Sequence, residues 1–430
     1  MVFLLVGLFL AVTWDWHGIT DTELNHLQTK ALVTHGDIDI SRYDRTFMFA
    51  LEHNDDLYSI YGVGVSLVAA PIYLALTKVG VDARVMEGTV GILFTAGSAA
   101  LFYVLLARLF DRRIAVGGTI VFVFGTTMWP LASTAFYQHA PVAFLQILAL
   151  LAFFARDERA PLRAGLAMGA AFFVRPTQVV LAATMGFLYL SEDRRKVARF
   201  TLGALPFFLG LLIQNRWIWG SWLEGGYARS GVGYHAFFGQ AIGGQTIGWW
   251  RGMFIYSPFL ILGVVGLVEA GRRRGWIEKR IIAIAAGSIL LLLFYSRWDT
   301  WWNGLHQFGY RYQLDFVPLI VLMVVYAIHV RPALVWAAAP LVGISILTMS
   351  AGMGSDPDRW DPVLYPKSVD LAPIGRAWSA FLDRPWGTLV RFAGVFLVGA
   401  ALLLATRRDR GRDNAQATDD DKRVPYPGAS

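Results

Sequence analysis

The chain has 430 residues, of which 56% are hydrophobic and only 16% are charged, and it contains no cysteine. Soluble domains carry about 25% charged residues, so this composition excludes an ordinary soluble fold and indicates a helical protein that crosses a membrane many times. The absence of cysteine excludes disulfides, thiol nucleophiles and cysteine metal sites. The net charge of +7 does not indicate nucleic acid binding, because the basic residues flank apolar segments.

Apolar segments recur along the chain and predict about 12 membrane-spanning helices. In chain order they cover residues 2–13, 88–106, 114–132, 142–155, 164–174, 179–190, 200–213, 254–269, 281–295, 316–330, 333–349 and 389–405. Arginine-rich clusters separate them at 108–113, 156–163, 194–199, 272–280 and 407–412. Because basic loops stay in the cytosol, we expect these clusters and both termini on the cytosolic side.

The apolar segment 60–79 does not fit this alternation. If it crossed the bilayer, the cluster at 108–113 and every later cluster would lie outside. The segment contains Gly62, Gly64 and Pro71, and few positive charges flank it. We therefore predict a juxtamembrane or re-entrant helix on the outer side, packed against protein. An ordinary span is the alternative, since glycine and proline are common in membrane helices.

These segments divide the chain into three parts. Residues 1–330 are expected to form the main membrane module, with a polar outer loop at 15–87. Residues 331–406 add C-terminal spans and an outer loop at 350–388. The charged tail 407–430 has nothing to bury, so we expect it to be disordered in the cytosol.

Ionisable and aromatic residues gather in the segments expected outside. The candidates are Asp21, Glu23, Tyr61, Gln138, His139, Arg175, Trp301, Trp302 and Arg311. An ionisable residue at membrane depth is costly and is a functional candidate by default, and Arg175 interrupts an apolar stretch. Carboxylates there can deprotonate a hydroxyl, arginines can hold a phosphate, and aromatic rings can stack on sugars or anchor the interface. Together these groups suit the transfer of a sugar from a lipid phosphate.

The order of these segments resembles the GT-C superfamily of polyprenyl-phosphate-dependent glycosyltransferases. It is similar in particular to bacterial relatives of the dolichyl-phosphate-mannose protein mannosyltransferases and to the aminoarabinose lipid A transferases. The resemblance is carried by Asp21 and by residues 31–33, 36–39, 61–64, 70–71, 138–141, 174–177, 256–259, 301–304 and 308–311. It covers residues 1 to about 330, and it implies an all-α membrane fold with a juxtamembrane helix in the first outer loop.

The resemblance also implies roles for the candidates. By position, Asp21 resembles the acidic residue of the first outer loop that serves the family as catalytic base or acceptor-binding group, and Glu23 is a second candidate. We expect Arg175 and Arg311 to bind the donor phosphate. Further substrate contacts are expected from Tyr61, Gln138, His139, Trp301 and Trp302. Many family members carry a second acid where this chain has Gln138-His139, so we expect no metal and no other cofactor.

The sequence therefore predicts a glycosyltransferase of the plasma membrane, with its site facing the periplasm or the cell exterior. It would move a hexose or pentose, with inversion, from a polyprenyl-phosphate donor to a hydroxyl of a lipid, glycan or protein. A lipid or polysaccharide transporter or flippase is the alternative, but it would need polar residues along a path through the membrane and usually paired repeats, and we find no such repeat. A non-catalytic scaffold would leave Arg175 unexplained.

Overall fold

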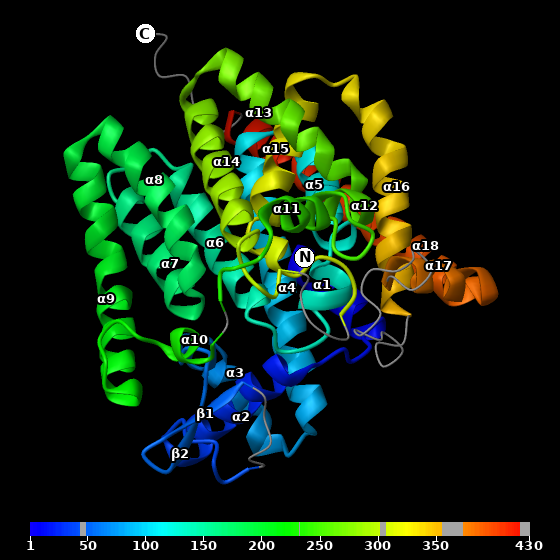
Figure 1. The fold of residues 1–430 in the computed structure, drawn as a ribbon. Helices are drawn as coiled ribbons and strands as arrows, with labels where there is room; N and C mark the ends of the chain where they lie inside the picture. Colours follow the sequence, from blue (N-terminus) through cyan, green and yellow to red (C-terminus); the bar gives the residue numbers. More distant parts are fainter. Residues whose placement is uncertain (44–48, 232, 302–306, 355–372, 422–430) are drawn as a thin grey trace.

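The computed structural model describes residues 1–43, 49–231, 233–301, 307–354 and 373–421, with side chains up to residue 406. The protein is 76% helical (Figure 1), and its described residues also contain one two-stranded hairpin. Four described helices are long and apolar enough to cross a bilayer. They are α4 Ala83–Leu109, α9 Arg194–Trp219, α16 Leu334–Met353 and the part Pro385–Thr406 of α18. The chain is therefore an all-α protein of the membrane.

Every segment that the sequence predicts as a span is largely helical in the structure. Besides the four above, the helices are α1 Val2–Val12, α5 Arg112–Phe124, η1 Met128–Ala132, α6 His139–Phe153, α7 Ala160–Val174, α8 Val179–Glu192, α12 Met253–Tyr256, η3 Pro258–Ile261, α13 Leu262–Arg273, α14 Trp276–Tyr295 and α15 Val317–Val330. Several of them are shorter than the roughly 20 residues that an upright span needs. The number of crossings therefore stays a prediction.

The arginine-rich turns meet at one end of the helix bundle. Contacts that join them are Arg199 with Glu158, Arg280 with Glu192, Arg331 with Glu269, the ring of Phe110 with that of His329, and Arg156 with the ring of Trp276. These contacts link the turns α4–α5, α6–α7, α8–α9, α13–α14 and α15–α16. The four clusters between 108 and 280 thus share one end of the molecule, and the assignment of that end to the cytosol stays a prediction.

The predicted outer loop 15–87 folds into its own layer, at the bottom of Figure 1. It contains α2 Thr20–His35, the antiparallel strands β1 Ala50–His53 and β2 Asp56–Ser59, and α3 Gly64–Val79. At the start of α2, the Thr22 hydroxyl accepts a hydrogen bond from the backbone N–H of Ile19 at 3.0 Å. The helix ends at Gly36, whose φ of +75° is a left-handed conformation that glycine adopts without strain.

Helix α3 occupies the segment predicted as juxtamembrane, and it pairs with α2. Gln28 Nε2 donates to Ser66 Oγ at 3.0 Å, and His26 Nδ1 lies 2.9 Å from the Tyr73 hydroxyl. A Cβ on Gly64 would clash with the backbone at Phe173, so the start of α3 abuts the end of α7. Helix α3 therefore connects the layer that carries Asp21 to the segment that carries Arg175.

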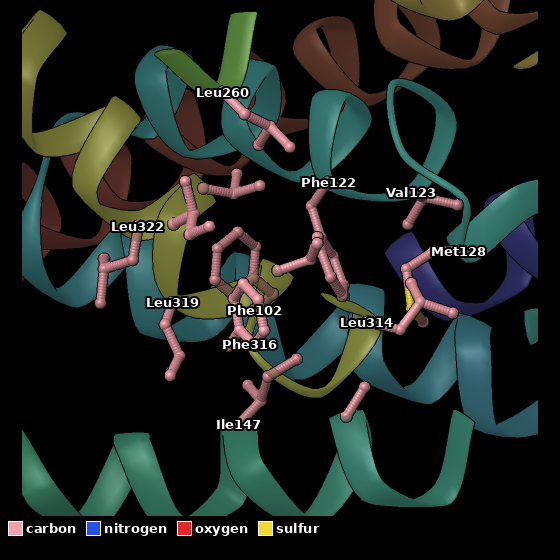
Figure 2. Packing of buried hydrophobic residues seen from close by; sticks show 14 of the residues in the cluster. Phe102, Phe122, Val123, Met128, Ile147, Leu260, Leu314, Phe316, Leu319 and Leu322 are labelled. Atoms are coloured by element: carbon pink, nitrogen blue, oxygen red, sulfur yellow. The ribbon is translucent and has the colours of Figure 1, made fainter. Parts of the chain in front are cut away.

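The hydrophobic core holds the polar segments of the other end in place. Figure 2 shows Phe102, Phe122, Leu314 and Phe316 packed among the apolar side chains of α4, α5, α6 and α15. The rings of Phe102 and Phe122 lie 4.7 Å apart. Because Leu314 and Phe316 are fully buried, the short helix η4 Tyr312–Asp315 has a fixed position, and so has Asp315 between them.

Helix α18 spans Pro385–Asp421 and so continues into the predicted tail 407–430. The disorder expected for that tail stays a prediction. Residues 422–430, and residues 355–372 of the last predicted outer loop, lie outside the described chain; α17 Pro373–Asp383 follows in that loop.

Candidate active site

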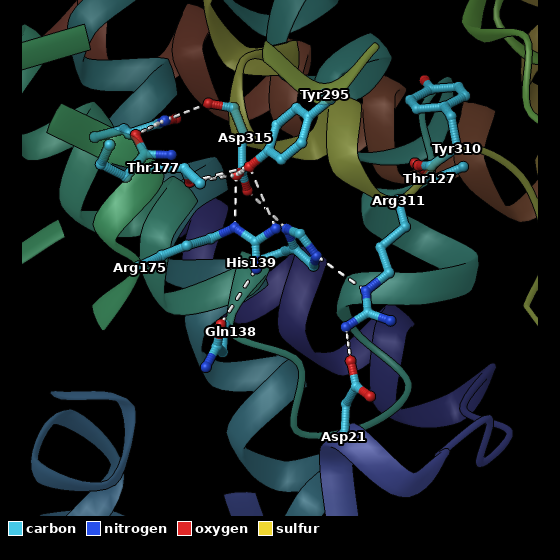
Figure 3. Close-up of polar contacts among 12 residues, drawn as sticks. Asp21, Thr127, Gln138, His139, Arg175, Thr177, Tyr295, Tyr310, Arg311 and Asp315 are labelled. Carbon is cyan, nitrogen blue, oxygen red and sulfur yellow. Dashed lines mark hydrogen bonds and ion pairs between the residues drawn. The ribbon is translucent and has the colours of Figure 1, made fainter. Parts of the chain in front are cut away.

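Asp21 and Arg311 are 290 residues apart in the sequence, yet they form a buried ion pair (Figure 3). Asp21 lies in the first turn of α2, and Arg311 directly precedes η4. Their side chains are only 9% and 11% exposed, respectively. Residues 15–87, which are predicted to form the first outer loop, and the segment before α15 therefore meet at this ion pair.

His139, at the start of α6, is the second partner of Arg311. Arg311 Nε donates to His139 Nε2 at 3.2 Å. Because arginine keeps all its protons, His139 Nε2 must be the unprotonated nitrogen, and the ring proton must be on Nδ1. His139 Nδ1 then donates to Asp315 Oδ1 at 2.8 Å. His139 is thus a neutral imidazole whose orientation is set at both nitrogens.

Asp315 lies at the centre of these contacts, although the sequence analysis did not single it out. Its carboxylate is fully buried and accepts hydrogen bonds from four side chains. The donors are His139, Arg175 Nε at 2.6 Å, Thr177 Oγ1 at 3.2 Å and the hydroxyl of Tyr295. A buried carboxylate stays charged only when it is paired and hydrogen-bonded in this way. In the sequence, Asp315 could have been found as an ionisable residue at the edge of a segment predicted to span the membrane.

Arg175 leaves the end of α7 in an extended conformation, as a residue before proline prefers. Its Nε pairs with Asp315, its Nη1 donates to Gln138 Oε1 at 3.2 Å and its Nη2 donates to the Tyr295 hydroxyl at 3.3 Å. The cost of an arginine inside an apolar stretch is therefore offset by complete pairing. The two Nη bonds go to neutral acceptors, so they are exchangeable for a stronger acceptor while the pair with Asp315 persists.

These five residues, Asp21, His139, Arg175, Arg311 and Asp315, are called the ion network below. Two guanidinium groups face two carboxylates, and the imidazole is neutral, so the ion network carries no net charge. Thr177, Tyr295 and Gln138 surround it with hydroxyl and amide groups. Such an arrangement is suited to anion binding and to proton transfer, provided that one of the internal pairs opens.

Aromatic rings extend from the ion network toward the first outer loop. Ring contacts run in series through Tyr295, Tyr312, Trp298, Tyr227 and Tyr61, with centroid separations of 5.0 to 6.2 Å. The guanidinium carbon of Arg175 lies 5.9 Å from the rings of both Tyr295 and Tyr312. Tyr61, a predicted substrate contact, therefore reaches the ion network through other rings rather than directly.

Of the remaining predicted site residues, two are not members of the ion network and one lies outside the described residues. Glu23 is exposed on α2, two residues beyond Asp21. Trp301 packs so closely on α11 Phe238–Thr246 that a Cβ on Gly244 would clash with its ring. Trp302 lies outside the described residues. The structure thus brings together Asp21, Gln138, His139, Arg175 and Arg311 from the predicted set, and adds Asp315, Tyr295 and Thr177.

Known structures share this arrangement of helices. No family model matches the chain, and no curated protein matches its sequence. The chain aligns with apo ArnT from Cupriavidus metallidurans at a TM-score of 0.50 and 15% identity, over 93% of this chain and 76% of that one. It aligns with the oligosaccharyltransferase of Archaeoglobus fulgidus, in complex with zinc and sulfate, at a TM-score of 0.51 and 14% identity. Both are GT-C membrane glycosyltransferases.

The chain therefore shares its fold with these two GT-C proteins. The second alignment covers 86% of this chain but only 58% of the archaeal protein, so the chain is much shorter than that relative. At 14% to 15% identity the likeness concerns the fold, and the roles of single residues depend on the contacts described above. The shared fold confirms the resemblance stated from the sequence, and the roles of the site residues stay predictions.

Proposed function

We propose that the chain is a glycosyltransferase that moves a sugar from a polyprenyl-phosphate donor to an acceptor hydroxyl at the outer face of the plasma membrane. The observation that carries this proposal is the buried Asp21–Arg311 pair beside the Arg175–Asp315 pair. These two pairs bring Asp21, the proposed base, close to Arg311 and Arg175, the two arginines that are proposed to bind the phosphate. The names of the two structural neighbours, one of them an oligosaccharyltransferase, support the reaction class.

In the proposed reaction, Asp21 takes the proton of the acceptor hydroxyl. The hydroxyl oxygen attacks the anomeric carbon, and the bond from that carbon to the phosphate oxygen breaks. The electron pair leaves with the phosphate, so the polyprenyl phosphate gains one negative charge. Arg311 and Arg175 stabilise that charge through bidentate hydrogen bonds. A single displacement of this kind inverts the configuration of the anomeric carbon.

The donor set favours a reaction without a metal. Both carboxylates of the ion network, Asp21 and Asp315, already face a guanidinium. Divalent cations such as Mg²⁺ and Ca²⁺ need carboxylate and carbonyl oxygens as ligands, whereas paired arginines select an anion. We therefore propose that transfer needs no metal and no other cofactor.

The proposed location of the site at the outer face is based on the distribution of the arginine-rich turns. The arginine-rich turns share one end of the bundle, and basic turns stay in the cytosol. The layer with α2 and α3 belongs to the predicted outer loop, so the donor would enter from the outer leaflet. The acceptor, in this proposal, is a hydroxyl of a lipid, a glycan or a protein.

The Asp21→Asn variant tests this function. Asparagine keeps the shape of the side chain but does not accept a proton at neutral pH, so we expect sugar transfer to fall by about a hundredfold or more. The assay measures transfer from a labelled polyprenyl-phosphate sugar in membranes that contain equal amounts of each folded variant. Glu224→Gln, which removes an exposed acid of another predicted outer loop, is the control and should transfer normally.

The outcome also distinguishes the two acid candidates. Loss in Glu23→Gln with normal transfer in Asp21→Asn would assign the base to Glu23 instead. If the wild-type protein transfers no sugar from any polyprenyl-phosphate donor, the proposed function is wrong.

A further inference from the structure

Arg311 has two partners of different kinds. Its Nε donates to a neutral acceptor, His139 Nε2, at 3.2 Å. Its Nη2 pairs with a charged acceptor, Asp21. His139 does not move freely, because its other nitrogen is bonded to Asp315, which in turn is held by Arg175 at 2.6 Å. The contact with His139 therefore keeps the Arg311 Nε in a fixed place, so Nη2 is the group that can turn to another acceptor.

The closed pair is incompatible with the chemistry proposed for both residues. A carboxylate beside a guanidinium is stabilised in its charged form, which makes it a weaker base. An Nη group that already donates to Asp21 is also a weaker ligand for phosphate. Moreover, the ion network is neutral, so an added phosphodiester brings one uncompensated negative charge into a buried site. The first two difficulties disappear if Arg311 releases Asp21, and the uncompensated negative charge then lies on Asp21, the residue that takes up the acceptor proton.

We infer that donor binding makes Arg311 exchange partners: Nη2 leaves Asp21 for an oxygen of the donor phosphate, while Nε stays on His139. This inference rests on the proposed function. A phosphate can win the exchange because it offers several oxygens to one guanidinium, and because Arg175 can add its two Nη groups, which now bond only neutral acceptors.

The exchange couples the two substrates. Asp21 becomes a strong base only when the donor phosphate occupies Arg311, so the acceptor hydroxyl is activated only when a donor is present. His139 and Asp315 are positioning residues in this scheme, because they hold Arg311 at the place from which it reaches both Asp21 and the phosphate. Donor binding before acceptor binding is the kinetic consequence.

The test measures binding of a polyprenyl phosphate, without a sugar, to protein in lipid nanodiscs. Asp21 competes with the phosphate for Arg311, so Asp21→Asn should bind the polyprenyl phosphate about tenfold or more tightly than the wild type, although it loses transfer. That factor corresponds to about 1.4 kcal/mol, at the lower end of coupling energies between close charge pairs. The corresponding uncharged polyprenol should bind both proteins equally.

Glu23→Gln is the matched control, because it removes one negative charge from the same helix at an exposed position. Its affinity for the polyprenyl phosphate should equal that of the wild type. If it binds as tightly as Asp21→Asn, the effect is general repulsion and the exchange is wrong. Equal binding by the wild type and Asp21→Asn also overturns the exchange but leaves the donor assignment intact. If no polyprenyl phosphate binds to the wild type, the proposed function itself fails.

If Asp21→Asn does not fold, a measurement on the wild-type protein tests the exchange of partners by Arg311 instead. A hydrophobic carbodiimide modifies carboxylates, and the buried, paired Asp21 should react slowly. Added polyprenyl phosphate should increase its labelling, detected by peptide mass spectrometry, because the pair with Arg311 opens. Labelling that stays constant or falls contradicts the exchange.

Discussion

Asp315 shows how a buried charge in this protein is held in place. Its carboxylate is fully buried and takes hydrogen bonds from His139, Arg175, Thr177 and Tyr295. Removal of one partner from a buried ion pair leaves the other charge without compensation, which costs about 3–5 kcal/mol. The contacts of Arg175 therefore serve the stability of the fold as well as the site.

We expect Asp315→Asn to lower the stability of the protein by about 3–5 kcal/mol, because Arg175 keeps its charge in a buried position without a carboxylate. The measurement is thermal or denaturant unfolding in detergent. Asp157→Asn is the matched control, since it makes the same change in a pair with Arg163 whose side chains are about half exposed. Surface pairs contribute less than about 1 kcal/mol, so equal effects of the two substitutions would contradict this account.

Helix α2 buries polar side chains, which is unusual for a helix in a membrane protein. Its inner face presents Asp21, Asn25 and Gln28, and Asn25 donates to the Phe136 carbonyl at 2.9 Å. His26, on the same helix, contacts Tyr73 on α3. Hydrogen bonds of these polar side chains hold α2 in place together with the apolar contacts of Leu24 and Leu27, so its stability depends in part on the protonation of its side chains.

His26 makes the contact between α2 and α3 sensitive to acid. Its pKa is lowered from 6.5 to about 4, mainly by burial and also by the nearby charge of Lys30, and Asp82 opposes this shift. The neutral ring is the folded form, so its contribution to stability is complete above about pH 6.5 and is lost as the pH falls toward 4.

We expect wild-type protein to lose about 2 kcal/mol more stability than His26→Gln between about pH 7.5 and about pH 5. Glutamine keeps a polar group beside Tyr73 but does not titrate. His35→Gln, at the exposed end of the same helix, is the control and should behave like the wild type. Unfolding curves at the two pH values provide the measurement, and identical pH dependence in wild type and His26→Gln would rule out this role.

The two ends of the molecule differ in chemistry, and we expect this difference to determine its orientation in the bilayer. One end collects the arginine-rich turns. The layer of α2, the hairpin and α3 lies at the bottom of Figure 1. The exposed face of α3 carries Leu67 and Leu74, an apolar surface suited to lipid contact.

Reporter fusions test this orientation. A reporter that is active only outside the cytosol should be active after Gly80 and inactive after Arg274, because α3 is expected to stay in the outer leaflet while basic turns remain inside. A reporter active only in the cytosol should give the opposite pattern. Cytosolic activity after Gly80 would mean that α3 crosses the bilayer, and the proposed outer location of Asp21 would then be wrong.

The positions of the helical segments and of the basic turns follow from local patterns in the sequence. Apolar length and arginine position predict the helical segments and the shared end of the basic turns, since both depend on the solvent each segment meets. The short helix α2 was not predicted, because its buried face is polar and hydropathy carries no signal for it.

The candidate site also has a part that the sequence predicts and a part that it does not predict. Asp21, His139, Arg175 and Arg311 could be named as candidates because ionisable groups stand out among apolar or outer segments. Their pairing could not be predicted, since Asp21 meets Arg311 across 290 positions of the chain. Asp315 gains its importance only from its neighbours in space. Hydropathy and charge act on each segment separately, whereas an ion network exists only after the helices have packed and brought its members within hydrogen-bond distance.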